Sequence, residues 1–470
     1  MSDADRLALS YSQEATFGVL PVATDTQITF SMTAADNSIN DSGSGFVSAG
    51  FVAGSRIAVS GFTGDTDNNQ NYRIDSVAAG KMILSDFVNT IVDDAAGESV
   101  TITEGVFKDI RYTSESLGQD TDTVQSAEIR NDRQVVDIVR TNVSASGDIN
   151  FELSYGSFDD FMEAALQSAA WSTEVSDTDT VHSMASGDNS INDSGSGYVS
   201  DGFVANQWIK VSGFLGGNAA NNSYFKISTV AAGKMVLVGG TVVTESAGDS
   251  VTITMGSQIV NGTTFRSFRF EKEFTDLTNI FANLDGSPVE GFALSVATET
   301  IVTGTFSFLG TTEVSAAATV AVGGSEAANT NNILNNVDNV PKFHDNYGEQ
   351  TELLAFTHAL SANLRQRLEV GQLGPQSFGS GKNAITGTVQ MYFSTIAIMD
   401  KYLAFTESVL SIVLEDDNGR AYVLDYPAIK YTEGRRVGGG ENTDIIADMS
   451  WTAKRDATEG IMVRIQRWPS

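Results

Sequence analysis

The chain contains few side chains of the types that catalyse reactions or hold metal ions. It has no cysteine, so disulfides and thiolate metal sites are impossible. Its histidines, His182, His344 and His358, are scattered and show neither metal-ligand nor triad spacing. His344 precedes Asp345, but adjacent side chains rarely cooperate. The nucleophile-elbow pattern Gly-x-Ser-x-Gly is absent. We therefore predict a protein that is not an enzyme, with no catalytic, cofactor-binding or metal-binding residues.

Two segments are similar to known binding motifs. Gly379-Ser-Gly-Lys382 is like the end of a phosphate-binding loop, but Asn383 replaces the required Ser or Thr and Gln376 replaces the leading Gly, so we reject it. Residues 36–45 read Asp-Asn-Ser-Ile-Asn-Asp-Ser-Gly-Ser-Gly, and clustered carboxylates suit calcium. The segment lacks the spacing and final Glu of an EF-hand, and a simple Asx turn also explains it. We favour the turn and keep calcium as the alternative.

The same decapeptide returns at residues 188–197, inside a longer duplication. The copies span residues 26–104 and 182–256, and unrelated sequence separates them, which predicts two modules inserted into a larger host. Short apolar runs between Gly, Asn, Asp and Ser clusters predict a small β-sandwich or β-barrel without a helix in each. The predicted core residues are Phe46, Phe51, Ile57, Val59 and Phe62 in module 1, and Tyr198, Phe203, Ile209, Val211 and Phe214 in module 2.

Composition limits the classes of function. A chain of 470 residues with 41% hydrophobic residues is globular and divides into several domains. With 28 Lys and Arg against 59 Asp and Glu, the net charge is −31, which disfavours stable binding to nucleic acid or to an anionic membrane. The N-terminus lacks signal-peptide features and no apolar stretch is long enough to span a membrane. We expect a protein made and used without Sec export.

The host, meaning the chain outside the modules, is predicted to be mainly β with two helices. Apolar spacing indicates a helix over residues 157–171, with Ser157 and Asp160 as a capping box. A second is indicated over residues 396–405, with a buried side of Ile398, Met399, Tyr402 and Leu403.

Alternating strands at residues 147–153 and 387–393 precede these helices, and residues 304–308 form a third strand of this type. Gly147 and Gly387 begin the first two strands, and Asp160 and Asp400 each follow 13 residues later. The host therefore shows a faint duplication. Polar segments at 118–133 and 361–383 lie upstream, and we expect binding arms, loops ordered by neighbours or plain linkers there.

The host resembles the major tail tube protein of long-tailed (siphovirus-like) bacteriophages. The similarity covers residues 107–171 and 264–455, and it depends on the order and spacing of several segments. These segments are Ile110-Arg-Tyr-Thr-Ser-Glu-Ser-Leu117, Glu128-Ile-Arg-Asn-Asp-Arg133, Ser146-Gly-Asp-Ile-Asn-Phe-Glu-Leu-Ser-Tyr-Gly156, Phe268-Arg-Phe-Glu-Lys-Glu-Phe274 and Val302-Thr-Gly-Thr-Phe-Ser-Phe308. The modules lie outside the family pattern and resemble small β-modules that decorate virion proteins.

This resemblance implies mainly β tail-tube sandwich or barrel domains with flanking short helices. Tube domain 1 would comprise residues 105–181 and 257–312, with residues 1–25 as an N-terminal arm or strand. Residues 313–345 would be a linker or arm, and residues 346–470 tube domain 2. Inner strands would close into a continuous barrel, and two tube domains per chain favour a trimer with pseudo-sixfold symmetry over a hexamer. The polar segments at 118–133 and 361–383 would contact the next ring.

The implied function is that of a structural virion subunit that polymerises into stacked rings, through which double-stranded DNA passes without stable binding. The implied partners are further copies of the chain, a tape-measure protein, a tail terminator and tail-tip proteins. We expect synthesis in the bacterial cytoplasm and a final location in the virion tail, without membrane association. The alternatives are another phage structural or decoration protein and an adhesive, carbohydrate-binding virion protein.

Overall fold

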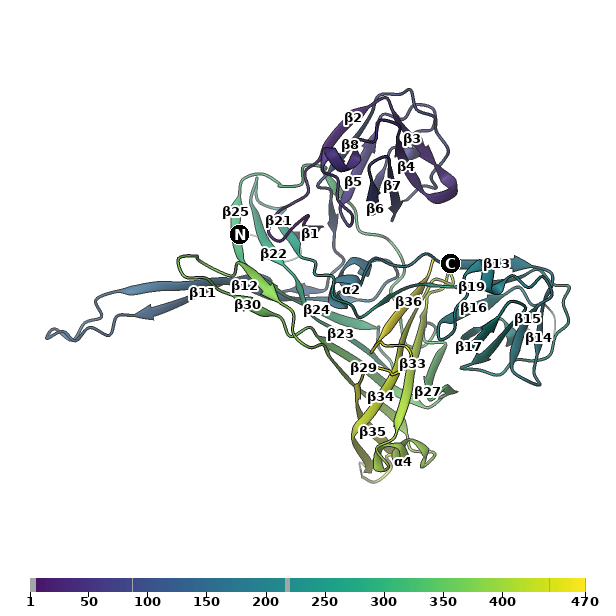
Figure 1. The fold of residues 1–470 in the computed structure, drawn as a ribbon. Coiled ribbons are helices and arrows are strands. Elements are labelled where there is room, and N and C mark those ends of the chain that lie inside the picture. The colour runs from purple at the N-terminus through teal and green to yellow at the C-terminus, as the bar shows by residue number, and fades with distance from the viewer. Residues whose placement is uncertain (1–5, 87, 216–219, 439, 470) are drawn as a thin grey trace.

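The computed structural model describes residues 6–86, 88–215, 220–438 and 440–469. These residues form a central β-body that carries two smaller sheets and a long projecting hairpin (Figure 1). The mainly β fold class predicted from the sequence is confirmed, since several sheets and only short helices are present.

A fourteen-stranded sheet forms the centre. Its main path runs β10-β12-β24-β23-β29-β32-β35-β34-β33-β27-β28, while β11 pairs with β12, and β36 pairs with β20 and β34. The strands along the path are β10 (Ser114–Glu115), β12 (Ile138–Glu152), β24 (Thr303–Gly310), β23 (Val289–Ala297), β29 (Leu353–Ser361), β32 (Ala384–Tyr392), β35 (Ile445–Ala453), β34 (Ala421–Gly438), β33 (Glu407–Glu415), β27 (Lys342–Asp345) and β28 (Gly348–Glu349). Beside them lie β11 (Gly118–Gln125), β20 (Ser257–Val260) and β36 (Arg464–Trp468).

A six-stranded sheet packs against the fourteen-stranded sheet and shares its hydrophobic core. Its order is β25 (Thr312–Ala316), β22 (Phe281–Ser287), β21 (Phe268–Phe274), β1 (Leu7–Gln13), β9 (Phe107–Asp109) and β26 (Ser325–Glu326). A separate hairpin joins β30 (Arg365–Arg367) to β31 (Ser377–Gly379). Aromatic side chains from both large sheets meet in one core, where Phe161 packs against Phe268, Phe306 and Phe308.

The host repeats one pattern of strand pairings. In the first half, β21 pairs with β1 and β22, β24 pairs with β12 and β23, and β22 pairs with β25. In the second half, β33 pairs with β27 and β34, β35 pairs with β32 and β34, and β34 pairs with β36. The long strand β34 thus takes the places of both β22 and β23. The halves are joined where β23 pairs with β29.

The strands predicted at 147–153 and 387–393 lie in β12 and β32, and residues 304–308 lie in β24, as predicted. The predicted helices exist as α2 (Asp159–Ala165) and α4 (Ala397–Leu403), each shorter than predicted. Leu403 is 67% exposed, so its predicted burial is wrong. The capping box is also wrong, because α2 begins after Phe158 without a side-chain cap. Asp160 and Asp400 do not correspond, because Asp160 is the second residue of α2 whereas Asp400 is the fourth residue of α4.

The two modules form seven-stranded sheets with the same strand order. Module 1 contains β2 (Thr24–Gln27), β8 (Val100–Glu104), β5 (Arg56–Ser60), β6 (Asn71–Ala78), β7 (Lys81–Ser85), β4 (Ser38–Asp41) and β3 (Phe30–Thr33). Module 2 contains β13 (Val175–Asp179), β19 (Val251–Met255), β16 (Trp208–Ser212), β17 (Tyr224–Ala231), β18 (Lys234–Val238), β15 (Ser190–Asp193) and β14 (His182–Ala185). All ten predicted core residues are buried.

The modules were predicted to lack helices, but each has one four-residue helix. These helices are α1 (Phe46–Ala49) and α3 (Tyr198–Asp201), and both end at a glycine with positive φ, Gly50 and Gly202. They follow the repeated decapeptide, in which the Asp41 carboxylate accepts hydrogen bonds from the backbone N–H groups of Gly43 and Gly45. The decapeptide therefore forms the Asx turn that we favoured.

Residues 313–345 do more than connect the halves. They include β26, which pairs with β9, and β27, which pairs with β33. The side chain of Glu326 also forms an ion pair with Arg56 of module 1, at 3.0 Å. The segment expected to be a linker or arm is thus packed onto both halves.

Candidate functional site: a polar sheet face between two open edges

One face of the central sheet is lined with small polar side chains. Over most of β12, β24, β23, β29, β32 and β35, buried residues alternate with exposed or half-buried ones, because successive side chains point to opposite faces. Strand register aligns the second set into rows. One row runs Ser114, Asn150, Thr305, Ala293, Ala359, Thr386, Thr452. We call this surface the polar face.

Neighbouring side chains on the polar face satisfy one another. Thr305 donates a hydrogen bond to Asn150 at 2.6 Å, and the hydroxyls of Thr357 and Thr388 lie 2.8 Å apart. Such cross-strand pairs stabilise a sheet and leave fewer hydroxyl groups free to bind other molecules. The result is a polar surface of mostly short side chains.

Acidic residues predominate among the charged residues of the polar face. Register places the acids Asp120, Asp148, Glu152, Glu433 and Asp448 on it. Arg435 and Lys430 occupy positions on the same face, and the Lys430 ammonium lies over the Phe405 ring, 4.1 Å from its centre. A polyanion close to this surface would therefore meet mostly negative charge.

The polar face ends at two open strand edges. Residues 119–125 of β11 are exposed and pair with β12 on one side only. At the other end, Glu433–Gly438 of β34 pairs with β35, and no described strand pairs with its second edge. Open edges present unpaired backbone N–H and C=O groups, so they are sites for pairing with another chain.

Module 1 is fastened to α2 by buried charges. The Asp160 carboxylate accepts from Arg73 at 2.9 Å, from Arg56 at 3.2 Å and from the Tyr11 hydroxyl at 2.8 Å, and Glu163 pairs with Arg73 at 3.0 Å. Burial alone would raise the pKa of Asp160, but the guanidinium groups of Arg73 and Arg56 lower it to about 2. Module 1 therefore docks with its charges compensated.

Module 2 is fastened to β34 and β36 by an aromatic cluster and ion pairs. Trp208 and Trp468 are buried together with Val423, and the Gln466 side chain bonds both backbone groups of Trp208. The Lys226 ammonium lies 2.8 Å from Asp425. This contact combines a buried aromatic cluster with a compensated charge.

Both modules use the same two positions for docking. Arg56 pairs with Arg73 in the module 1 register, and Trp208 pairs with Lys226 at the equivalent place in module 2. Sequence analysis missed these residues, because the residue type alone does not show whether an arginine is buried or exposed. A signal existed in the replacement of Arg56 by Trp208 between otherwise similar copies.

The three histidines lie in different places, each beside a ring. The Nδ1 atom of His182 is 3.1 Å from the Tyr198 hydroxyl, and that of His358 is 2.9 Å from the Tyr426 hydroxyl. His344 packs against Trp208. Burial lowers the pKa of His358 to about 3, and burial with nearby Lys342 lowers that of His344 to about 4. Both are neutral packing residues near pH 7 and do not form a site together.

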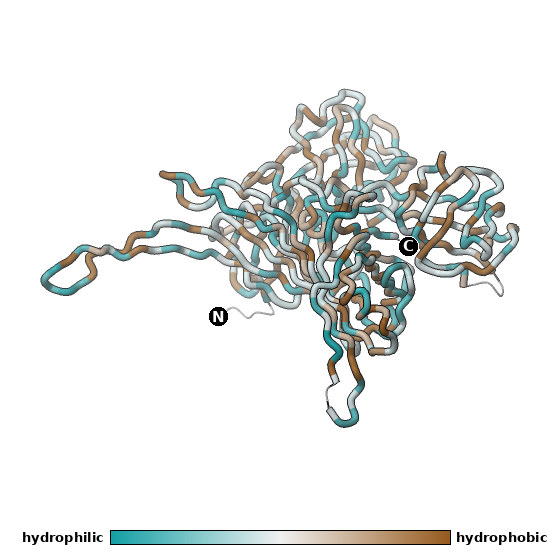
Figure 2. Tube along the Cα trace, turned by 60° about the horizontal axis from the view of Figure 1, so that its bottom comes forward, coloured by the Kyte–Doolittle hydropathy of each residue, from teal (hydrophilic) through white to brown (hydrophobic). Residues whose placement is uncertain are grey.

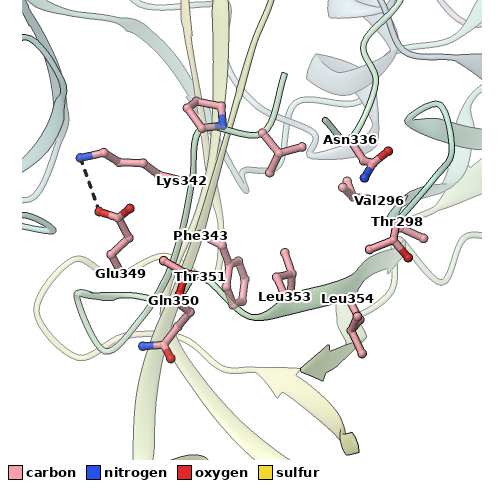
Figure 3. A pocket seen from close by; sticks show the side chains of 13 residues that line it. Val296, Thr298, Asn336, Lys342, Phe343, Glu349, Gln350, Thr351, Leu353 and Leu354 are labelled. Carbon is pink, nitrogen blue, oxygen red and sulfur yellow. Dashed lines mark ion pairs between the residues drawn. The ribbon is translucent and has the colours of Figure 1, made fainter. Parts of the chain in front are cut away.

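A pocket of about 300 Å³ lies where β23, β27 and β29 meet (Figure 3). Val296, Phe343 and Leu353 line it, and Lys342 faces Glu349 across one side at 3.9 Å. Glu349 is the one carboxylate among the lining residues, and it already pairs with Lys342. The pocket therefore lacks a free acid and base.

Within the described part of the chain, no three histidine or acidic side chains are grouped as metal ligands would be. None of the described helices is long and apolar enough to cross a membrane. The arrangement that distinguishes this molecule is thus the polar face with its two open edges.

Comparison with known proteins gives one informative result. Residues 5–453 match the family model described as phage tail tube protein, which is nearly the whole chain. A comparison with curated proteins gives no significant match.

Proposed function

The chain belongs to the phage tail tube protein family, and from this premise we propose that it polymerises into stacked rings that form the hollow tail of a long-tailed phage. The observation that carries the proposal is the polar face between two open edges. Copies placed side by side would pair these edges, and a curved ring would enclose the polar face as its inner wall.

We propose three chains per ring. Each half of the host supplies four of the eight strands that carry the polar face, namely β10, β12, β24 and β23, then β29, β32, β35 and β34. Three copies would bring six such units and thus pseudo-sixfold symmetry, and head-to-tail contacts form a closed ring when the rotation per copy completes a circle.

Double-stranded DNA would pass along the polar face without stable binding. Short polar side chains and mainly acidic charge support this role, because phosphate contacts by Lys and Arg supply most non-specific DNA affinity. By family membership, we further propose a tape-measure protein inside the tube, and a terminator and tip proteins at its ends. The protein would be made in the host cytoplasm and reside in the virion.

The modules would decorate the outside of the tube. Module 1 contacts α2, and α2 packs on the apolar side of the sheet, where Phe161 meets Phe306. Module 1 is therefore separated from the polar face by the sheet and by the helix. Figure 1 shows both modules displaced from the strands that carry this face.

Electron microscopy of the purified protein at high concentration tests the proposal. Stacked rings with a central channel and external knobs are expected, and their symmetry distinguishes three chains from six. Compact particles that never polymerise would contradict the proposal and favour a decoration or adhesive virion protein.

The hairpin of β11 and β12 is proposed as an arm between copies, including contacts with the next ring. Deleting residues 119–131 should leave a folded subunit, because these residues are exposed and lie outside the core. The midpoint of thermal unfolding should be the same as in the natural chain, while polymerisation should be lost. Normal tubes from this variant would refute the assignment.

A further inference from the structure

The two halves of the host match residue by residue around their central strands. Gly147 pairs with Phe308 in the first half, and Gly387 pairs with Trp451 in the second. A Cβ at Gly147 would overlap the carbonyl oxygen of Ser116, and one at Gly387 would overlap that of Thr357. Ser116 is therefore the equivalent of Thr357, and β10 with β11 is the equivalent of β29.

The next strand shows the same correspondence. The register of β23 against β24 shifts between Val289 and Gly291, and that of β34 against β35 shifts between Tyr431 and Glu433. Ser307, the partner of Gly291, is equivalent to Ser450, the partner of Glu433. A β-bulge at one matched position fixes the alignment, so Ser295 corresponds to Val437.

Within the chain, the halves meet where β23 pairs with β29. This junction is antiparallel and includes Ala293 with Ala359 and Ser295 with Thr357. The equivalents of these two strands are β34, from Glu433 to Gly438, and β10 with β11, from Ser114 to Asp120. Both of these segments end the polar face, and no described strand pairs with their outer edges. At Leu117 the backbone N–H donates to the Glu115 carboxylate and the C=O accepts from the Lys272 ammonium, contacts that pairing with a second copy would replace. The chain therefore carries both sides of a second such junction, at opposite ends.

We propose that neighbouring copies of this chain meet by repeating the contact between its own two halves. The edge of β34 pairs with β10 and β11 of a second copy, antiparallel, with Val437 opposite Ser116, Arg435 opposite Gly118 and Glu433 opposite Asp120. The inference rests on the proposed ring and specifies which atoms close it. The contact is head to tail, so it closes only when the rotation per copy completes a circle.

Charges at the two edges suit this pairing. The β34 edge carries Arg435 and Arg436, and the β11 edge carries Asp120 and Asp122. Glu433 opposite Asp120 is a like-charged pair, but Arg435 lies two residues along the same face of β34, within diagonal reach of Asp120. The combined edges therefore attract more than they repel.

The equivalence of the two halves also indicates which surface the projecting hairpin of β11 and β12 contacts. Residues 362–383 form the corresponding arm of the second half, and this arm folds onto the first half. Ser380 bonds Gln167 at 2.9 Å, and Phe378 packs against Phe17. Gln167 follows the end of α2 with a φ of 48°, and Phe405 follows the end of α4 with a φ of 51°. Phe405 therefore corresponds to Gln167.

Both surfaces of this second contact carry exposed apolar side chains. Figure 2 shows hydrophobic residues along the projecting arm. Its exposed side chains are Val124, Ile129, Val135, Val136, Ile138 and Val139. Leu403, the last residue of α4, is 67% exposed, and Phe405, two residues later, is 55% exposed, whereas Gln167 is 5% exposed. In the assembled ring, the arm of one copy covers Leu403 and Phe405 of the next.

Cysteine cross-linking tests the register directly, because the natural chain has no cysteine. Directly opposite Cβ atoms in antiparallel strands lie about 4.5–5.5 Å apart, within reach of a short bifunctional thiol reagent. The Ser116→Cys and Val437→Cys double variant should cross-link between chains, and only after assembly. Ser295→Cys with Thr357→Cys is the matched control, which should cross-link within one chain before assembly.

Peptide mass spectrometry identifies the linked residues, and denaturing gels count the chains in the largest covalent species. Equal cross-linking of Val437→Cys with Asp120→Cys, four residues out of register, would overturn the inference. So would tubes in which the Ser116 and Val437 pair fails to link while the control pair links. If the unmodified chain forms no tubes, the proposed function fails first and this inference fails with it.

Discussion

At the scale of single residues, Asp160 links three side chains, those of Tyr11, Arg56 and Arg73. It is 8% exposed and joins α2 to module 1 through Arg56 and Arg73. Replacing Asp160 with Asn removes the charge and leaves two buried guanidinium groups less compensated, which typically costs about 3–5 kcal/mol. We expect that loss in the free energy of unfolding measured by denaturant titration. Asp36→Asn, at an exposed ion pair with Lys81, should leave stability unchanged.

A second residue-scale prediction concerns acid stability. His358 has a pKa lowered to about 3 and His344 to about 4, below the ordinary value of 6.5. Below pH 6.5 these two histidines become protonated in the unfolded chain but stay neutral in the folded chain. The free energy of unfolding therefore falls as the pH drops from 6.5 towards 4. In His358→Gln this decline should be shallower, as measured by the free energy of unfolding at several pH values. An unchanged slope would mean that His358 is not buried in its neutral form.

At the scale of elements, the exposed end of α4 gives a test independent of cross-linking. Phe405→Asp places a charge where the arm of the next copy is expected, so it should raise the protein concentration needed for assembly by at least tenfold. The isolated subunit should unfold as before, because Phe405 is 55% exposed. Val47→Asp, at a residue of module 1 that is 57% exposed, is the matched control and should assemble normally. Equal behaviour of the two variants would argue against the contact.

Sequence patterns predicted elements well wherever one face of an element is buried. The alternation in β12 and β32 and the apolar stripe of α2 identified those elements, because burial of one face dictates their period. The module cores were predictable for the same reason. Leu403 was misjudged because its apolar side chain is exposed in the single chain, and residue type does not distinguish a buried apolar side chain from an exposed one.

Long-range strand pairings and the docking contacts of the modules could not be predicted from the sequence. The packing of residues 325–326 onto β9 depends on partners more than two hundred residues away, and no local propensity encodes it. The polar face was only partly predictable. Alternation indicated a polar side for individual strands, but the register that gathers eight strands into one surface comes from bulges and from close approaches at Gly147 and Gly387.

At the scale of the whole molecule, the position of charge should matter more than its amount. Asp148 and Asp448 lie on the polar face. Changing both to Lys moves the net charge from −31 to −27 and places cations on the proposed inner wall. Tubes of this variant should retain short double-stranded DNA in co-sedimentation, and retention should fall steeply as salt rises, because bound phosphates release counterions. Asp67→Lys with Asp201→Lys, at exposed positions on the two modules, changes the net charge equally. That control should retain far less DNA than the inner-wall variant, because its cations lie outside the channel. Equal retention by the two variants would show that the polar face does not line the path of DNA.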